Sequence, residues 1–260
     1  MKFHINGTLN TVNMKKVDLV TTKTPLRVSF LGGGTDIKNF YGKFGGSVLS
    51  SAIDKYVYVT VKRHSPCFKE KFRLNYSKSE TGNSLSKIQN NIVRECIKLV
   101  KINFPIYIST VGDVPTGSGL GGSSSFTVGL LNALYAIQGK KIKKKRLFED
   151  ACRIEIEILK EPIGKQDQYA AAIGGVNTIG FLPDGSVSID PLILSDNTKQ
   201  RIENAHLSAT SGIRKISVST GAKSAVKPIT LADTVFYPKM TFLNNKEKEK
   251  EDLFRKDLSF

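Results

Sequence analysis

Apolar residues recur at every second position in several short stretches of the chain, which is typical of strands with one buried face. This pattern predicts strands at residues 22–31, 47–62 and 105–109. Two further stretches, residues 176–181 and 186–189, are separated by a Pro-Asp-Gly segment, a combination typical of turns, and predict a β-hairpin.

Apolar positions spaced three to four residues apart predict helices between these strands. Residues 86–101 have this spacing, and a strongly apolar segment that begins near Ser123 predicts a second helix. A third helix, residues 145–160, is expected to run without interruption until Pro162 prevents its continuation. Residues 164–175 predict a loop, a short helix and a glycine cap.

These elements divide the chain into three parts. Residues 1–20 form a polar N-terminal extension, residues 21–194 a folded domain, and residues 195–260 a C-terminal segment in which the hydrophobic periodicity fades. Lys, Glu and Asp dominate residues 244–256, so we expect this tail to be solvated and disordered. Every candidate motif lies in the middle part.

Composition adds a folded core and a strong positive charge to this description. Of 260 residues, 40% are hydrophobic and 24% charged, which excludes a chain that is disordered throughout. The 39 Lys and Arg against 23 Asp and Glu give a net charge of +16. This charge favours an anionic partner: a nucleic acid, a membrane surface or a phosphorylated small molecule. Charge alone does not distinguish among the three.

The sequence indicates a cytoplasmic protein without a membrane partner. The N-terminus lacks the apolar core of a signal peptide. Residues 114–139 contain no charged residue, but they begin with a Gly/Ser loop, and their apolar part, residues 126–137, is too short to span a bilayer. The widely spaced Cys67, Cys96 and Cys152 predict free thiols in a reducing cytosol. The chain has only three histidines, so we expect any metal to be held by oxygen ligands.

A glycine-rich loop leads directly into the helix that begins near Ser123. Glycines let backbone N–H groups approach an anion, and a helix N-terminus adds a positive dipole end, so polyphosphate is the expected ligand. The loop contains G-x-G-x-x-G at Gly117, Gly119 and Gly122, but a lysine cluster follows where dinucleotide-binding proteins have an acidic ribose ligand. A Walker A loop is excluded because no lysine follows the glycines. Helix capping is the alternative role of the serines at residues 123–125.

Three segments, in chain order, resemble the motifs of the GHMP kinases. They are TPLRVSFLGGGTD at residues 24–36, PTGSGLGGSSS at residues 115–125 and EPIGKQDQY at residues 161–169. Within this superfamily the chain resembles the D-glycero-D-manno-heptose 7-phosphate kinases, with fucokinase-type sugar kinases as near neighbours. The resemblance covers residues 22–190 and implies an α+β fold, that of the GHMP-kinase N-terminal domain (ribosomal S5 domain 2-like), with an incomplete C-terminal domain.

The resemblance also implies roles for single residues. Asp167 lies at the position of the catalytic aspartate, which orients or deprotonates the attacking hydroxyl, and Arg27 lies where a basic residue stands near the transferred phosphate. A helix N-cap is the alternative for Asp167, and an outward-facing strand arginine is the alternative for Arg27. ATP is the implied phosphoryl donor, bound by the loop residues Pro115, Gly117, Ser118, Gly119, Leu120, Gly121, Gly122, Ser123 and Ser124.

Mg²⁺ is the implied metal. Ser123 matches the serine that ligates Mg²⁺ in this superfamily, and Ser124 is its alternative because the loop departs from the usual register. Mg²⁺ prefers such hard oxygen ligands. Glu155, on the helix before the catalytic segment, is expected to complete the metal site, with Glu157 as its alternative. Either glutamate would otherwise be a solvated helix residue.

Substrate contacts are implied at two places in the chain. Asp36 ends the GGGTD segment, where related sugar kinases bind substrate hydroxyls, and an Asx turn is its alternative role. Gly34 and Thr35 precede it, and Lys165 and Gln168 flank the catalytic aspartate. These five residues are the expected substrate-binding set.

The resemblance ends near residue 190. GHMP kinases carry a third glycine-rich motif near the C-terminus, and no such run follows Gly175. Residues 211–215 are faintly similar to heptose kinases, whereas residues 217–260 match nothing, which predicts a truncation or a shifted reading frame. Met14 is an alternative start of translation.

The expected function is ATP- and Mg²⁺-dependent phosphorylation of the anomeric hydroxyl of a sugar phosphate, D-glycero-D-manno-heptose 7-phosphate, to the 1,7-bisphosphate. The alternatives are a weak or inactive remnant that binds nucleotide, a fucokinase-type sugar kinase and a basic nucleic-acid-binding domain. No nucleic-acid partner is expected, because aromatic residues are not interleaved with the lysine cluster at residues 140–145. The sequence leaves the oligomeric state open.

Overall fold

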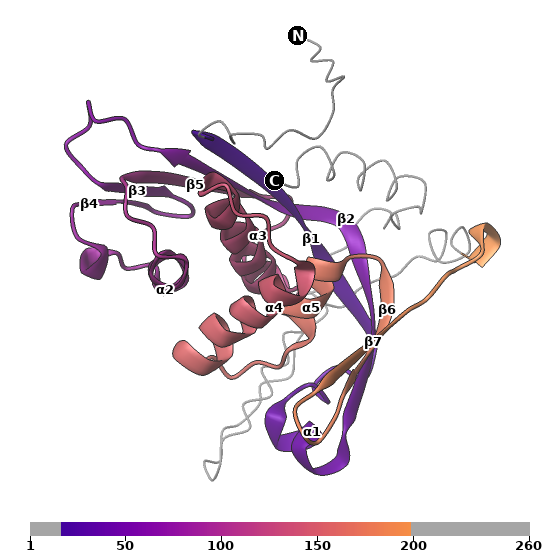
Figure 1. Ribbon diagram of the computed structural model, residues 1–260. Helices are drawn as coiled ribbons and strands as arrows, with labels where there is room; N and C mark the ends of the chain where they lie inside the picture. Colours follow the sequence, from indigo (N-terminus) through magenta and orange to yellow (C-terminus); the bar gives the residue numbers. More distant parts are fainter. Residues whose placement is uncertain (1–16, 199–260) are drawn as a thin grey trace, which may run out of the picture.

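A single mixed sheet forms the frame of residues 17–198, the part of the chain that the computed structural model describes (Figure 1). Its seven strands are β1 (Leu19–Leu31), β2 (Gly46–Arg63), β3 (Phe72–Asn75), β4 (Ser79–Gly82), β5 (Ile106–Gly112), β6 (Val176–Phe181) and β7 (Val187–Pro191). The helices are α1 (Lys38–Phe44), α2 (Asn91–Val100), α3 (Gly122–Ile137), α4 (Lys144–Cys152) and α5 (Gln166–Ile173), with a 3₁₀ turn at Leu85–Lys87 and a π-helical segment at Arg153–Ile158.

The long strand β2 organises this sheet. It pairs with β1 along nearly its whole length, while its second half pairs with β5 and its first half with β6, all antiparallel. The strand order is β4-β3-β5-β2-β6-β7, with β1 beside β2. The pairing of β1 with β2 shifts register between Pro25 and Arg27. Such irregularities re-aim side chains and are frequent beside active sites.

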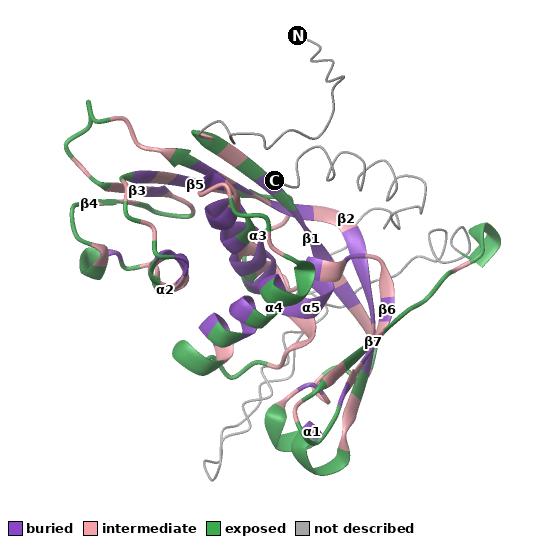
Figure 2. Cartoon of the chain, viewed as in Figure 1, coloured by how far each residue is buried: buried purple, intermediate pink, exposed green. Residues whose placement is uncertain are grey.

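Helix α3 is the central element of the core. It packs against β1 and β2 on one side and against α2, α4 and α5 on the others. Figure 2 shows buried positions along nearly all of α3, as expected for a helix that is apolar around its circumference. Two hydrogen bonds fix it to β1: Thr22 Oγ1 donates to the Gly129 carbonyl at 2.9 Å, and Ser125 Oγ donates to the Pro25 carbonyl at 2.8 Å. The start of α3 is therefore held beside Arg27.

Most of the expected elements are confirmed. The strands predicted at residues 22–31, 47–62 and 105–109 are β1, β2 and β5, the predicted hairpin is β6 and β7, and the helix expected near Ser123 is α3. The short helix expected within residues 164–175 is α5, and Gly174 is its C-cap. β1 begins at Leu19, two residues before the predicted domain boundary.

Two predicted helices differ from those observed. The helix expected at residues 86–101 begins only at Asn91, because the Asn90 side chain caps it by accepting from the Val93 amide at 3.1 Å. The prediction of an uninterrupted helix at residues 145–160 is wrong. α4 ends at Cys152, and residues Arg153–Ile158 continue as a π-helix. Insertions of this kind are frequent at functional sites.

Several expectations fall outside the described residues. These are the structure of most of the N-terminal extension, the weak similarity at residues 211–215 and the charged tail at residues 244–256. Within residues 17–198, no helix has the length and apolar character needed to cross a membrane.

Candidate active site

The glycine-rich loop reaches α3 through alternate left-handed residues. Gly117, Gly119 and Gly121 have φ angles of 83°, 74° and 76°, a conformation that side-chain-bearing residues rarely adopt. Gly121 is the N-cap of α3, and no side chain caps this helix. The alternative role of residues 123–125 as caps is therefore wrong. Uncapped N–H groups at the start of a 16-residue helix, preceded by such a loop, are suited to bind anionic oxygens.

Arg27 joins this loop to Asp167. Its Nε and Nη2 lie 2.7 and 2.6 Å from Asp167 Oδ1, and its Nη1 donates to the Gly119 carbonyl at 2.8 Å. The backbone N–H of Arg27 also donates to the Leu120 carbonyl at 3.1 Å. The outward-facing strand arginine is excluded by these contacts. Arg27 therefore contacts both the aspartate and the loop. The position beside the transferred phosphate, which the resemblance implied, stays a prediction.

Asp167 faces the glycine-rich loop from the first turn of α5. A Cβ atom placed on Gly121 would lie 3.4 Å from Asp167 Oδ2 and 3.3 Å from Arg27 Cγ, so the loop packs directly on this ion pair. The N-cap of α5 is Lys165, which excludes the N-cap role for Asp167. Both contacts with Arg27 fall on Oδ1, which leaves Oδ2 outside this ion pair.

Glu155 contacts the first turn of α3 through Ser123. Its carboxylate is fully buried and accepts hydrogen bonds from Ser123 Oγ at 3.1 Å and Gln168 Nε2 at 2.6 Å. Burial raises the pKa of Glu155, and the hydrogen bonds from Gln168, Ser124, Ser123 and Thr127 oppose that shift. The solvated-helix role is therefore excluded for Glu155. The alternative ligand, Glu157, is exposed to solvent.

The chemistry of these donors fits Mg²⁺. Ser123 is exposed, whereas Ser124 is buried, so the Ser123 hydroxyl and the Glu155 carboxylate are the pair that would hold the ion. Both are hard oxygen donors. The described residues contain no group of three or more His, Cys, Asp or Glu side chains suited to a metal, so phosphate oxygens and water would complete the coordination.

The residues expected to bind substrate do not all face one site. Gln168 is fully buried and bonded to Glu155, which makes it a support for that carboxylate and not a substrate ligand. The Thr35 hydroxyl lies 2.8 Å from the Gly32 carbonyl and 3.1 Å from the Ser47 amide, so it fixes the turn after β1. Asp36 is 2% exposed and contacts the catalytic segment. Both residues are therefore engaged within the protein.

Gly34 and Lys165 are the expected substrate residues that stay accessible. Gly34 has open space at its α-carbon and a φ angle of 90°. Lys165 is half-buried, and its Nζ donates to the Gly185 carbonyl at 3.1 Å and lies 5.3 Å from the centre of the Tyr41 ring. Lys165 therefore places a cation two residues from Asp167.

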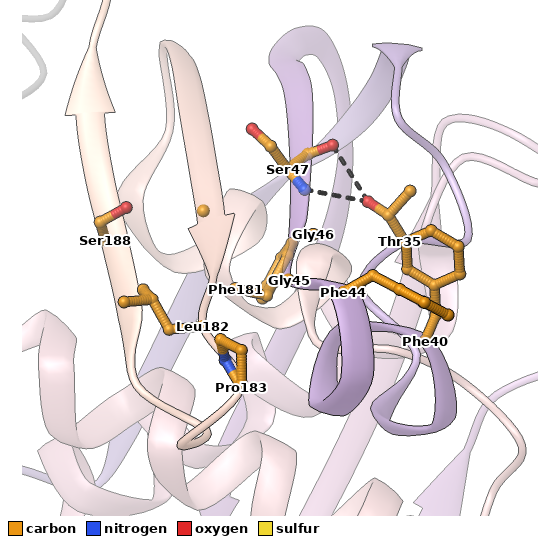
Figure 3. A pocket seen from close by; sticks show the side chains of 11 residues that line it. Thr35, Phe40, Phe44, Gly45, Gly46, Ser47, Phe181, Leu182, Pro183 and Ser188 are labelled. Carbon is orange, nitrogen blue, oxygen red and sulfur yellow. Dashed lines mark hydrogen bonds between the residues drawn. The ribbon is translucent and has the colours of Figure 1, made fainter.

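A separate pocket of about 610 Å³ opens beside α1 and the β6–β7 turn (Figure 3). Phe40, Phe44, Phe181, Leu182 and Pro183 supply most of its apolar lining. Thr35 is one of the residues that line this pocket, and Figure 3 shows its hydrogen bonds to Ser47. The catalytic candidates described above do not line it. The pocket is therefore distinct from the site at the start of α3.

Two supporting residues were not identified from the sequence. Thr127 lies one helical turn after Ser123, donates to the Ser123 carbonyl at 3.0 Å and opposes the rise in the pKa of Glu155 that burial causes. Its spacing of four residues from Ser123 was the available signal. Gln166 binds Asp36 through its backbone N–H and its side chain, at 3.0 and 3.4 Å. No sequence signal links residues 130 positions apart.

Comparison with known proteins agrees with this arrangement. Residues 91–175 match the GHMP kinases N terminal domain. A D-glycero-alpha-D-manno-heptose 7-phosphate kinase from Campylobacter jejuni is 34% identical over 196 residues, which cover 71% of this chain and 57% of the relative. A galactokinase from Pyrococcus furiosus is 26% identical over 236 residues, which cover 82% of this chain and 63% of the relative. The chain thus spans less than two thirds of the length of either relative.

Solved structures share the same fold. A D-glycero-D-manno-heptose 1-phosphate kinase from Bacteroides thetaiotaomicron aligns with a TM-score of 0.65 and 28% identity, over 71% of this chain and 63% of that protein. A mevalonate kinase from Methanococcus jannaschii aligns with a TM-score of 0.53 and 19% identity, over 73% of this chain and 60% of that protein. The predicted α+β fold is therefore confirmed.

Proposed function

We propose that this chain, of which residues 91–175 match the GHMP kinases N terminal domain, transfers the γ-phosphoryl group of ATP to the anomeric hydroxyl of D-glycero-D-manno-heptose 7-phosphate, in the cytoplasm. The Campylobacter relative supports the choice of sugar. The observation that carries the proposal is the packing of the Arg27–Asp167 pair against Gly121, which puts a carboxylate beside a loop built for anionic oxygens.

The loop residues and the N-terminus of α3 would bind the phosphates of ATP through backbone N–H groups. Leu120 contributes only its backbone to that surface, since its side chain is buried in the core. Bound Mg²⁺ would neutralise the phosphate charge. The Ser123 hydroxyl and the Glu155 carboxylate would hold it, next to the loop that binds those phosphates.

Asp167 would act on the sugar. Its Oδ2 accepts the proton of the anomeric hydroxyl as the oxygen attacks the γ-phosphorus, and the bond from that phosphorus to the β,γ-bridging oxygen breaks to release ADP. Arg27 orients Asp167 through two contacts with Oδ1. Lys165 is the cation that we assign to the 7-phosphate of the sugar.

We predict that Gln168→Leu weakens the binding of Mg²⁺ with ATP about tenfold, because partners that orient a metal ligand typically contribute this much to affinity. The variant removes the 2.6 Å hydrogen bond that orients Glu155. Calorimetry with a non-hydrolysable ATP analogue, with and without Mg²⁺, measures the effect. Metal-free binding should stay unchanged, as should both affinities of the exposed control Gln89→Leu. Equal losses with and without Mg²⁺ would contradict the role of Gln168.

The substrate is tested by ADP release from the purified chain with ATP, Mg²⁺ and one sugar at a time. D-glycero-D-manno-heptose 7-phosphate should be turned over, while fucose and galactose should not. Turnover of fucose alone would replace the proposal by a fucokinase-type activity. A folded chain that binds ATP and turns over no sugar would refute phosphoryl transfer by this chain and favour a nucleotide-binding remnant.

A further inference from the structure

We propose that Asp36 is a positioning residue: its carboxylate caps the N-terminus of α5 and thereby holds Asp167 against the glycine-rich loop. This inference rests on the proposed function for the role of Asp167. It assigns Asp36 a task different from the substrate contact that the sequence resemblance implied.

The contacts of Asp36 are those of a helix cap supplied from a distant part of the chain. Oδ2 accepts the backbone N–H of Gln166 at 3.0 Å, and Oδ1 lies 3.4 Å from Gln166 Nε2. Gln166 is the first residue of α5, so its N–H has no acceptor within the helix. The N-cap residue itself, Lys165, makes no capping bond. Asp36 therefore replaces the side-chain cap that Lys165 does not supply, and its carboxylate lies at the positive end of the α5 dipole.

Gly164, three residues before Asp167, allows the Asp36 carboxylate to approach the backbone closely. A Cβ atom placed on Gly164 would lie 1.9 Å from Asp36 Oδ2 and 2.1 Å from Asp36 Cγ. Only glycine leaves room for such an approach. Asp36 thus contacts the segment at residues 164 and 166, immediately before Asp167.

The turn that carries Asp36 is held in place by hydrogen bonds of Thr35. Thr35 binds the backbone of Gly32 and Ser47 through its hydroxyl, which ties the turn after β1 to the start of β2. Asp36 is 2% exposed, and both of its carboxylate oxygens lie within hydrogen-bond distance of Gln166. Burial raises the pKa of Asp36, the Gln166 N–H opposes this shift, and the neighbouring charge of Asp167 adds to it.

Hydrogen exchange in the resting protein tests the cap without any activity. In the wild-type chain, the Gln166 amide should exchange about tenfold more slowly than the Asp167 amide, which has no acceptor within the helix. In Asp36→Ala this protection should be lost, and in Asp36→Asn it should be partly kept, because Asn retains one acceptor oxygen. Asp190→Asn, a change of an exposed carboxylate on β7, is the matched control.

Kinetics separates positioning from substrate binding. Asp36→Asn should lower kcat about tenfold and leave the KM of the sugar within twofold, because Asp167 is displaced while the sugar contacts remain. A rise in the sugar KM with unchanged kcat and unchanged Gln166 exchange would overturn the inference and restore Asp36 as a substrate ligand. An unprotected Gln166 amide in the wild-type chain would also overturn it. Absence of sugar turnover in the wild type, with Gln166 protected, would refute the proposed function and not the cap.

Discussion

Asp167→Asn is expected to lower kcat for phosphoryl transfer by about 10³-fold, the range lost when a positioned general base is removed. Asn has nearly the same shape as Asp, so the packing against Gly121 is kept. The amide cannot take up a proton, and it offers Arg27 a neutral oxygen in place of the charged Oδ1. Transfer therefore fails at the acceptor hydroxyl, while the loop remains in place.

The affinity of Asp167→Asn for ATP should be measured together with its kcat. The loop and the α3 N-terminus, which bind the phosphates in this account, are unchanged in Asp167→Asn, so the dissociation constant of ATP should stay within about threefold of the wild-type value. Glu157→Gln serves as a matched control, since it neutralises an exposed carboxylate. Turnover that is equal in Asp167→Asn and wild type would remove Asp167 from the mechanism.

Arg27→Met should lower kcat by about 10²-fold and also weaken ATP binding. The guanidinium holds Asp167 Oδ1 through two nitrogens and the Gly119 carbonyl through a third, so its loss releases the aspartate and the loop together. An uncompensated carboxylate would then remain in a partly buried position.

Arg27→Lys should recover little of this loss, because a single ammonium group cannot bridge both partners in the geometry of the guanidinium fork. Steady-state kinetics and ATP titration of Arg27→Met and Arg27→Lys measure the effect, with the exposed Arg153→Met as the control. If Arg27→Lys has wild-type kcat and ATP affinity, a positive charge is sufficient at this position, and the bridging role assigned to Arg27 is wrong.

Local patterns in the sequence were sufficient to predict the elements that frame the site. Alternation predicted β1, β2, β5 and the β6–β7 hairpin, and the apolar run after Ser123 predicted α3. The glycine-rich loop also followed from local chemistry, since its glycines and the helix after it are contiguous in the chain. These features depend on neighbours in sequence.

Short elements and the π-helical segment were not predictable in this way. β3 and β4 have four residues each and gain their hydrogen bonds from each other and from β5, while α1 has only seven residues. Such lengths give too few positions for a periodic pattern. The π-helical segment that carries Glu155 forms in a run of ordinary helical spacing, and its buried glutamate is paired with Ser123 and Gln168 from other helices.

The roles of single site residues depended on contacts between distant parts of the chain. Asp167 and Glu155 were predicted as functional residues, and the structure brings both to the start of α3, where the roles assigned to them stay predictions. Arg27 was expected beside the transferred phosphate, which stays a prediction, and the structure joins it to an aspartate 140 residues away. Gln168 and Asp36 were expected to contact substrate, yet they support Glu155 and α5. The sequence therefore indicated which polar residues belong to the site, but it did not indicate which residues they contact.

The transfer of ³²P from [γ-³²P]ATP to D-glycero-D-manno-heptose 7-phosphate, by wild type and Asp167→Asn in parallel, measures both the proposed reaction and its dependence on Asp167. We expect a labelled heptose bisphosphate with the wild-type chain and about 10³-fold less with the variant, at unchanged ATP affinity. If label transfer is the same in both proteins, or absent from a folded wild-type chain that binds ATP, the proposed function of this site is wrong.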